Sequence, residues 1–327
     1  MTPPTDLSRR DALRAISVGG LGAAALSAGA SGGGAGGGEP DGRRRVLRVA
    51  HLTDMHIDGE RGSDRALAAC YAHAQEHGAE LILNTGDTVM ELNGASRTGA
   101  ERQWGVFQRV TKAECGLEMV SAIGNHDCWG WESGGSAEPG RGKQMVRQEL
   151  ALPGRYYRVD RAGWSFVVLD SIWSGEGGGY AGRLDGEQLE WLREELAKIG
   201  PETPTVVMTH IPIITACGFF DGERFGERCG ERGWTIPGSW MHEDARALKD
   251  LFIKHPNVKL ALSGHMHQLD RVDFAGVSYV CSGAVSGNWW KGQYYGCDYG
   301  YSMIDLFDDG SFEQSYHGYG WDGEGAG

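Results

Sequence analysis

The sequence is poor in positive charge. Its 31 lysines and arginines face 44 aspartates and glutamates, which gives a net charge of −13 over 327 residues. A protein that binds the nucleic-acid backbone needs a basic face, and so does one that docks on an anionic membrane. The composition therefore argues against both kinds of partner.

The sequence also lacks paired cysteines. None of its seven cysteines forms a C-x-x-C motif, which argues against a zinc ribbon and against a thioredoxin-like redox centre. We interpret most of them as small buried hydrophobic residues. A disulfide between Cys217 and Cys229, which flank a glycine-rich loop, is an open alternative if the chain is exported.

A long hydrophobic run is missing as well. The N-terminal segment pairs Arg9 and Arg10 with a weakly apolar stretch, residues 15–30, that ends in a small-x-small pattern. This stretch is too short and too mild for a membrane span, and it resembles a bacterial twin-arginine signal. No cysteine near the cleavage pattern could accept a lipid. We expect a signal peptide over residues 1–30 and an exported, periplasmic or secreted protein without a stable membrane anchor.

Glycine is abundant, with 53 residues, and part of it forms a low-complexity run over residues 31–38. We interpret residues 31–44 as a flexible linker. The body, residues 45–321, alternates short apolar strands with amphipathic helices and ends in hairpins. That order predicts an α/β sandwich with mixed sheets.

Polar residues follow five of the predicted strands. They occur as Asp54-x-His56, Gly86-Asp87, Gly124-Asn125-His126-Asp127, His210 and Gly264-His265-x-His267. Sites in α/β sheets collect at the carboxyl ends of strands, so we expect these residues to form one site.

The donor types in this set indicate a metal centre. Carboxylate and amide oxygens together with imidazole nitrogens suit first-row divalent metals. Residues two apart in an extended segment share a face, so Asp54 with His56, and His265 with His267, can act together. The absence of a thiolate favours a catalytic site over a structural zinc site.

The order of these motifs resembles the calcineurin-like metallophosphoesterase superfamily over about residues 45–270, and within it the class III cyclic-nucleotide phosphodiesterases. The resemblance implies a four-layer αββα sandwich of two mixed β-sheets flanked by helices. It also implies that residues 45–321 form a metallophosphoesterase domain with two divalent ions, with manganese, iron and zinc left open.

The resemblance assigns a role to each motif residue. One metal would be held by Asp54, His56, Asp87 and His267. The other would be held by Asp87, Asn125, His210 and His265. Asp87 would thus bridge both ions, while His126 would lie over the substrate phosphate and be oriented by Asp127. Two metals about 3.5–4 Å apart clamp the attacking and leaving oxygens, and a metal-bound water supplies the hydroxide nucleophile.

One position departs from the family pattern. An acidic residue or asparagine often stands three positions after the G-D aspartate, and a tyrosine stands there in purple acid phosphatases. Here the position is Met90, followed by Glu91. The departure argues against the purple acid phosphatase branch.

The predicted function is hydrolysis of a small phosphodiester. A phosphomonoesterase, a nucleotide or lipid pyrophosphatase and a non-catalytic metal-binding scaffold are the alternatives, and the oligomeric state stays open. The His126–Asp127 pair argues against the scaffold, because a scaffold has no use for it.

Two further features remain open between a structural and a functional interpretation. Trp129, Trp131, the Trp289-Trp290 pair and the Tyr294-Tyr295 pair could pack a core or form a wall that stacks on the substrate. The segment 212–240 directly follows His210 and is a candidate cap over the site.

Overall fold

The structure is a computed structural model that describes residues 42–130, 141–174, 179–221, 229–230 and 233–323. The chain divides into one unit that ends at Pro40 and a second, Asp41–Gly327, to which all the described residues belong. The predicted signal peptide and all but the last residues of the predicted linker lie outside the described residues. Among the described helices, none has the length and apolar character needed to cross a membrane.

The first sheet has five strands in the order β15-β14-β1-β2-β3. Their bounds are β1 Arg45–Leu52, β2 Leu81–Asn84, β3 Met119–Ser121, β14 Gly300–Phe307 and β15 Phe312–Gly318. The strands β1, β2 and β3 are parallel, and the C-terminal hairpin of β14 and β15 adds antiparallel to β1.

The second sheet has six strands in the order β12-β13-β11-β8-β5-β4. Their bounds are β4 Tyr157–Arg161, β5 Trp164–Val168, β8 Thr205–Met208, β11 Val258–Ser263, β12 Asp270–Phe274 and β13 Val277–Cys281. The four central strands are parallel, and β4 and β12 pair antiparallel at the two edges. Central strands such as β8 are apolar throughout because both faces of the sheet are covered.

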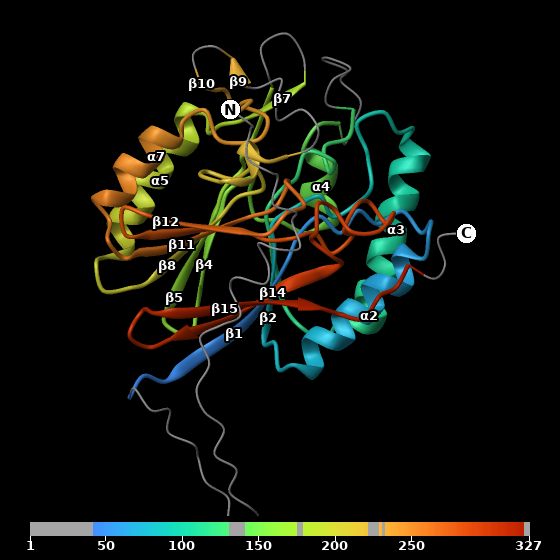
Figure 1. The fold of residues 1–327 in the computed structure, drawn as a ribbon, viewed down its shortest axis with the longest axis horizontal. Helices are drawn as coiled ribbons and strands as arrows, with labels where there is room; N and C mark the ends of the chain where they lie inside the picture. The colour runs from blue at the N-terminus through green and yellow to red at the C-terminus, as the bar shows by residue number, and fades with distance from the viewer. Residues whose placement is uncertain (1–41, 131–140, 175–178, 222–228, 231–232, 324–327) are drawn as a thin grey trace, which may run out of the picture. The chain divides into compact units, whose positions relative to one another are not determined.

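Helices cover the outer face of each sheet, and the two sheets pack face to face (Figure 1). The helices are α2 Ser63–Glu76, α3 Arg97–Glu114, α4 Gln144–Glu149, α5 Gly186–Ile199 and α7 Ala245–Ile253. The first core joins α2 and α3 to the first sheet, and another joins α5 and α7 to the second. Between the sheets, Leu47 and Leu83 pack with Phe166 and Leu262. The predicted four-layer αββα sandwich is confirmed.

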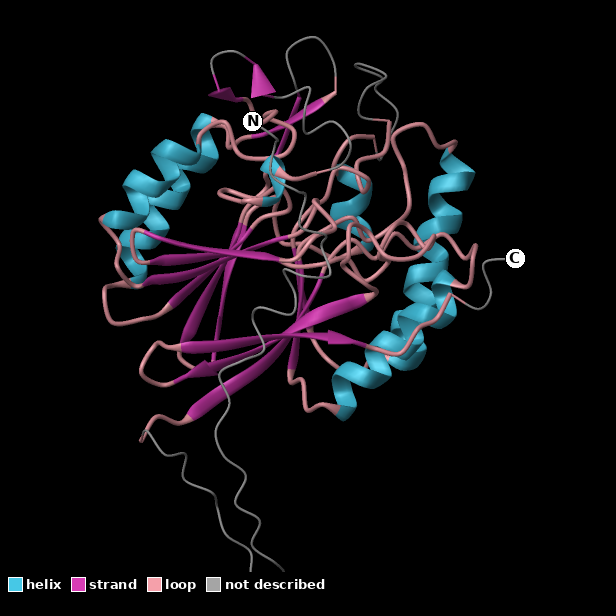
Figure 2. Ribbon diagram, viewed as in Figure 1, coloured by secondary structure: helices cyan, strands magenta, loops and turns pink. Residues whose placement is uncertain are grey.

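Connections between the layers contain structure that the sequence did not indicate (Figure 2). A short hairpin, β6 Ile172–Ser174 with β7 Tyr180–Gly182, precedes α5. The segment after His210 contains a 3₁₀ turn at Cys217–Phe219 and a two-stranded ribbon, β9 Cys229–Gly230 with β10 Gly233–Trp234.

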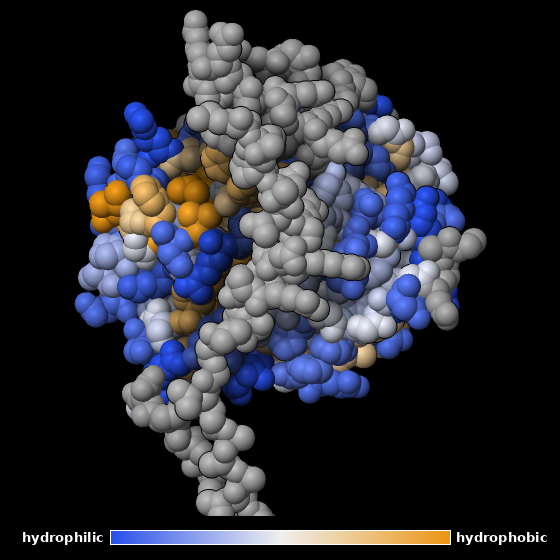
Figure 3. Space-filling model, viewed as in Figure 1, coloured by the Kyte–Doolittle hydropathy of each residue, from blue (hydrophilic) through white to orange (hydrophobic). Residues whose placement is uncertain are grey.

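On the face drawn in Figure 3, hydrophobic residues gather over α7, where Ile253 is 53 % exposed.

Candidate metal centre

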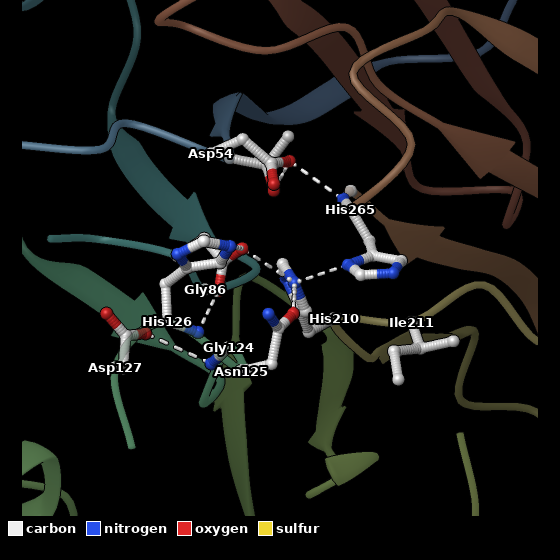
Figure 4. A network of polar contacts seen from close by, with 12 residues as sticks. Asp54, Gly86, Gly124, Asn125, His126, Asp127, His210, Ile211 and His265 are labelled. Atoms are coloured by element: carbon white, nitrogen blue, oxygen red, sulfur yellow. Dashed lines mark hydrogen bonds and ion pairs between the residues drawn. The ribbon is translucent and has the colours of Figure 1, made fainter. Parts of the chain in front are cut away.

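The carboxyl ends of five strands bring the predicted residues together (Figure 4). The first sheet supplies Asp54 and His56 after β1, Asp87 after β2, and the segment from Asn125 to Asp127 after β3. The second sheet supplies His210 after β8, and His265 with His267 after β11. The site therefore lies at the junction of the two sheets, and each sheet contributes about half of it.

The backbone at these strand ends is held in a sparsely populated conformation. Positive φ angles occur at Asp54 (51°), His56 (47°), Asp87 (51°), His265 (71°) and His267 (54°). A non-glycine residue with positive φ costs free energy, and such residues cluster at functional sites. These turns aim successive side chains toward one centre.

Two glycines in the motifs permit close approach of neighbouring strand ends. A Cβ on Gly124 would lie 2.1 Å from Oδ1 of Asp87, and a Cβ on Gly264 would lie 2.3 Å from Oδ2 of Asp54. No other residue fits at either position without displacing a predicted ligand. The glycines of G-N-H-D and G-H-x-H thus make room for the carboxylates.

The first ligand group consists of Asp54, His56 and His267, whose ligand atoms lie within 4.8 Å of one another. Nδ1–H of His56 donates to the carbonyl of Met90, and Nδ1–H of His267 donates to the carbonyl of Gly287. The two Nε2 atoms lie 3.1 Å apart. Oδ1 of Asp54, buried and without a hydrogen-bond partner, lies 3.4 Å from Nε2 of His267. A cation between these three atoms would satisfy all of them.

The second group consists of Asp87, His210 and His265. Nδ1–H of His210 donates to the carbonyl of Thr85, and Nε2–H of His265 donates to the carbonyl of Ser239. The remaining ring nitrogens of these two histidines lie 3.1 Å apart.

The pKa values show how this second group is satisfied without metal. Burial alone would lower the pKa of His210, but Asp87 raises it to about 9, so a proton lies on this ring. Burial and the neighbouring His210 lower the pKa of His265 to about 3, which leaves its facing nitrogen unprotonated. Metal binding would displace the proton of His210. Asn125 completes the group, with Oδ1 at 3.0 Å from Nε2 of His210.

Asp87 lies between the two groups. Its Oδ2 is 3.2 Å from Nε2 of His210 and 3.8 Å from Nε2 of His56, while its Oδ1 accepts from the backbone N–H of His126. One carboxylate oxygen thus faces ligands from both groups. This is the position that a bridging ligand requires.

Two carboxylates are buried in the centre. Burial alone would raise the pKa of Asp54, but His267 lowers it below its usual value; for Asp87, His210 has the same effect. Both groups therefore stay ionised inside the protein, where an uncompensated charge is costly. Two divalent cations would compensate them, so the residues fit the metal pair that the sequence predicted.

His126 lies at the edge of the centre and is 22 % exposed. Its Nδ1 contacts the carbonyl of Met90 at 2.8 Å and the carboxylate of Glu91 at 3.1 Å. Burial would lower its pKa, but Asp87 and Glu91 raise it to about 10 in the metal-free protein. The ring is thus a proton donor beside the ligand groups.

The expected contact between Asp127 and the ring of His126 is not formed. Instead, Oδ1 of Asp127 accepts from the backbone N–H groups of Thr88 and Val89, and Oδ2 accepts from the N–H of Gly124. Asp127 therefore ties the strand ends of β2 and β3 together. Glu91 contacts the imidazole in its place, one position beyond the family's usual polar site, and this role was not predicted from the sequence.

A cavity of about 220 Å³ opens over the centre. It is lined by Asp87, His126, Tyr180, Asp221, Trp240, His265, Met266, Trp289 and Tyr294. The candidate cap thus contributes Asp221 and Trp240.

The aromatic residues divide between the two interpretations. Trp289 and Tyr294 line the cavity, whereas Trp129 and Trp290 are 2 % and 1 % exposed and belong to the core beside the first sheet. Trp131 lies outside the described residues.

Fold and site together define a metal-dependent phosphoester hydrolase. Residues 47–269 match the family described as calcineurin-like phosphoesterase, whose members use a dimetal centre. The chain belongs to the calcineurin-like phosphoesterase family, as its motifs predicted.

Two curated relatives support this assignment. The chain is 26 % identical over 242 residues to a probable cyclic nucleotide phosphodiesterase of Synechococcus, an alignment that covers 69 % of this chain and 76 % of the relative. It is 25 % identical over 227 residues to the 3′,5′-cyclic adenosine monophosphate phosphodiesterase CpdA of Pseudomonas aeruginosa, with 67 % and 69 % covered.

Solved structures share the fold. A dimetal phosphatase from Danio rerio superposes with a TM-score of 0.56 at 14 % identity, covering 84 % of this chain and 100 % of that one. The purple acid phosphatase PPD1 of yellow lupin superposes with a TM-score of 0.56 at 18 % identity, covering 85 % and 52 %. At such identities the likeness concerns the fold alone.

Proposed function

We propose that the chain hydrolyses small phosphodiesters. The observation that carries this choice is the charge of the cavity: among its described lining residues there is no lysine or arginine. A phosphomonoester presents a second charged oxygen, and a pyrophosphate presents more, and proteins commonly bind such oxygens with arginine or lysine. A diester carries one charge, which the metals and His126 can balance. The two curated relatives, which are named as cyclic-nucleotide phosphodiesterases, agree with a diester.

Each residue of the site would have its own role in this reaction. Two divalent cations, when bound, would supply a nucleophile near neutral pH and neutralise the phosphoryl oxygens. Asp87 would set their spacing, because its Oδ2 faces both ligand groups. His126, held by Met90 and Glu91 at the cavity, would donate its proton to the leaving oxygen. Manganese, iron and zinc all suit this nitrogen and oxygen donor set.

A substrate comparison tests the proposal. Purified protein loaded with Mn²⁺ should hydrolyse bis(p-nitrophenyl) phosphate with a kcat/KM at least roughly tenfold above that for p-nitrophenyl phosphate. The variant Asp87→Asn, prepared identically, controls for contaminating phosphatases. A preference for the monoester would overturn the proposal, and elemental analysis of protein purified without added metal would identify the native ions.

We also propose that the enzyme is exported by the twin-arginine route. The paired Arg9 and Arg10 ahead of a short apolar stretch support this. The double substitution Arg9→Lys and Arg10→Lys should leave active enzyme in the cytoplasm, measured as activity after cell fractionation. Unchanged export of the double variant would show that these arginines are not the signal.

A further inference from the structure

Aromatic side chains wall the cavity on both sides of the metal centre. On the side of the second ligand group, the ring of Tyr180 lies edge-on to His265 with centroids 5.7 Å apart, and Trp240 also lines the cavity. On the side of the first group, Trp289 stacks on His267 at 4.0 Å, and Tyr294 stands at 90° to Trp289. Any group that a substrate phosphate carries into this cavity therefore meets aromatic surfaces.

The backbone of Trp289 supports a functional role for this wall. Trp289 has a φ of 47°, a conformation that is costly for a bulky aromatic residue. Such strain persists only where the surrounding structure enforces it, and it clusters at ligand sites. One face of the Trp289 indole lies against His267, which orients the ring over the metal centre.

Besides the metal ligand Asp87, one other carboxylate lines the cavity among its described residues, that of Asp221. Oδ1 of Asp221 accepts from the hydroxyl of Tyr294 at 2.8 Å and from Nε2 of Gln268 at 3.2 Å. Within the described residues, no lysine, arginine or histidine pairs with Asp221. A carboxylate beside a phosphate site repels further phosphates. It would be stabilised by a cation on the substrate itself.

We propose that the cavity binds a diester in which one alcohol carries an ammonium group, of the type of choline. The proposal rests on the proposed phosphodiesterase activity and adds the substrate class. Ammonium groups bind over the faces of tryptophan and tyrosine within about 6 Å of the ring centroid. Asp221 supplies the matching charge, so the phosphate would lie at the metals and the cation among Tyr294, Trp289 and Asp221.

The size and shape of the cavity favour a compact cation over a nucleobase. Its volume of about 220 Å³ is below the ~300–1,000 Å³ of pockets that enclose larger ligands. A flat base is held best in a slot between parallel rings, whereas Trp289 and Tyr294 stand perpendicular. Perpendicular walls suit a rounded group such as trimethylammonium.

A pair of isosteric substrates tests the proposal with Mn²⁺-loaded protein. One is p-nitrophenyl phosphocholine, and the other replaces trimethylammonium by the neutral tert-butyl group, so that only the charge differs. The kcat/KM for the choline ester should exceed that for the neutral ester by roughly tenfold. Asp221→Asn should reduce this ratio toward one, while Asp298→Asn, which removes an exposed carboxylate outside the lining residues, should leave it unchanged.

A binding measurement separates recognition from turnover. In calorimetric titrations, phosphocholine should bind the wild-type protein about tenfold more tightly than its tert-butyl isostere, and Asp221→Asn should remove the difference. Equal kcat/KM for the two esters, or a higher value for cyclic adenosine monophosphate, would overturn the proposal and leave the phosphodiesterase function intact. Failure to hydrolyse both esters and bis(p-nitrophenyl) phosphate would instead overturn the proposed function itself.

Discussion

Asp87 links the two ligand groups through one carboxylate oxygen, Oδ2. Asp87→Asn keeps the oxygen that accepts from the N–H of His126 and removes the charge that faces His210 and His56. Removing one partner of a buried charge cluster costs about 3–5 kcal/mol, so metal affinity should fall by roughly 10²–10⁴ at both groups. Elemental analysis at limiting metal should show a loss from about two ions to fewer than one per chain.

Asp58→Asn is the control for this change. Asp58 is a buried carboxylate two residues after His56, but its Oδ1 accepts from the N–H of Glu60 and from the hydroxyl of Ser63 rather than facing a ligand. Its substitution should leave the stoichiometry unchanged. Retention of both ions by the Asp87 variant would contradict the bridging role.

Substitution of His126 should lower kcat without removing the metals. His126→Ala removes a ring that contacts Met90 and Glu91 and whose nearest approach to Asp87 is 3.9 Å. The metals should stay, and kcat should fall by roughly 10²–10⁴, the range for a positioned proton donor. The loss should be smaller with a p-nitrophenolate leaving group than with an alkoxide, because p-nitrophenolate needs little protonation. Loss of metal in proportion to activity would make His126 a ligand.

At the scale of elements, the strand ends depend on their glycines. Gly264 follows β11, and a Cβ there would lie 1.8 Å from Oγ1 of Thr53 and 2.3 Å from Oδ2 of Asp54. Gly264→Ala should therefore lower the free energy of unfolding by about 1–3 kcal/mol, as overpacking does, and weaken metal binding at the first group. Urea unfolding of the metal-free protein and elemental analysis measure the two effects.

Gly105→Ala provides the matched control. Gly105 lies in α3 on the exposed side, and a Cβ there would meet nothing within 4 Å. Alanine is the better helix former, so this change should stabilise the protein by about 0.5–1 kcal/mol. A Gly264 variant that unfolds like the Gly105 variant would show that the strand end after β11 can shift freely.

The elements differ in how far their sequence determines them. Strands such as β8 and the helix α5 were predictable, since a short apolar run and a stripe formed by Leu192 and Leu196 are local patterns. The hairpin of β6 and β7 was missed because its three-residue strands carry no period. The partner of His126 was also missed: Asp127 is its neighbour in sequence, but the fold turns that carboxylate toward Gly124 and Thr88.

At the scale of the whole molecule, the metal centre joins the two sheets. The first ligand group combines Asp54 and His56 of the first sheet with His267 of the second. The second group combines Asp87 of the first sheet with His210 and His265 of the second. The residues of this junction could be predicted from the motifs. Which sheet supplies each one depends on strand pairings that no local pattern specifies.

This arrangement predicts that metal removal lowers the stability of the entire domain. A ligand that binds only the folded state stabilises it by RT ln(1 + [L]/Kd), or about 2.7 kcal/mol per site at a hundred times Kd. Dialysis against a chelator should therefore lower the Tm by several degrees. Added Mn²⁺ should restore it in proportion to the logarithm of its concentration. Asp87→Asn should show a much smaller response, and an equal Tm with and without metal in the wild-type protein would show that the sheets pack independently of the centre.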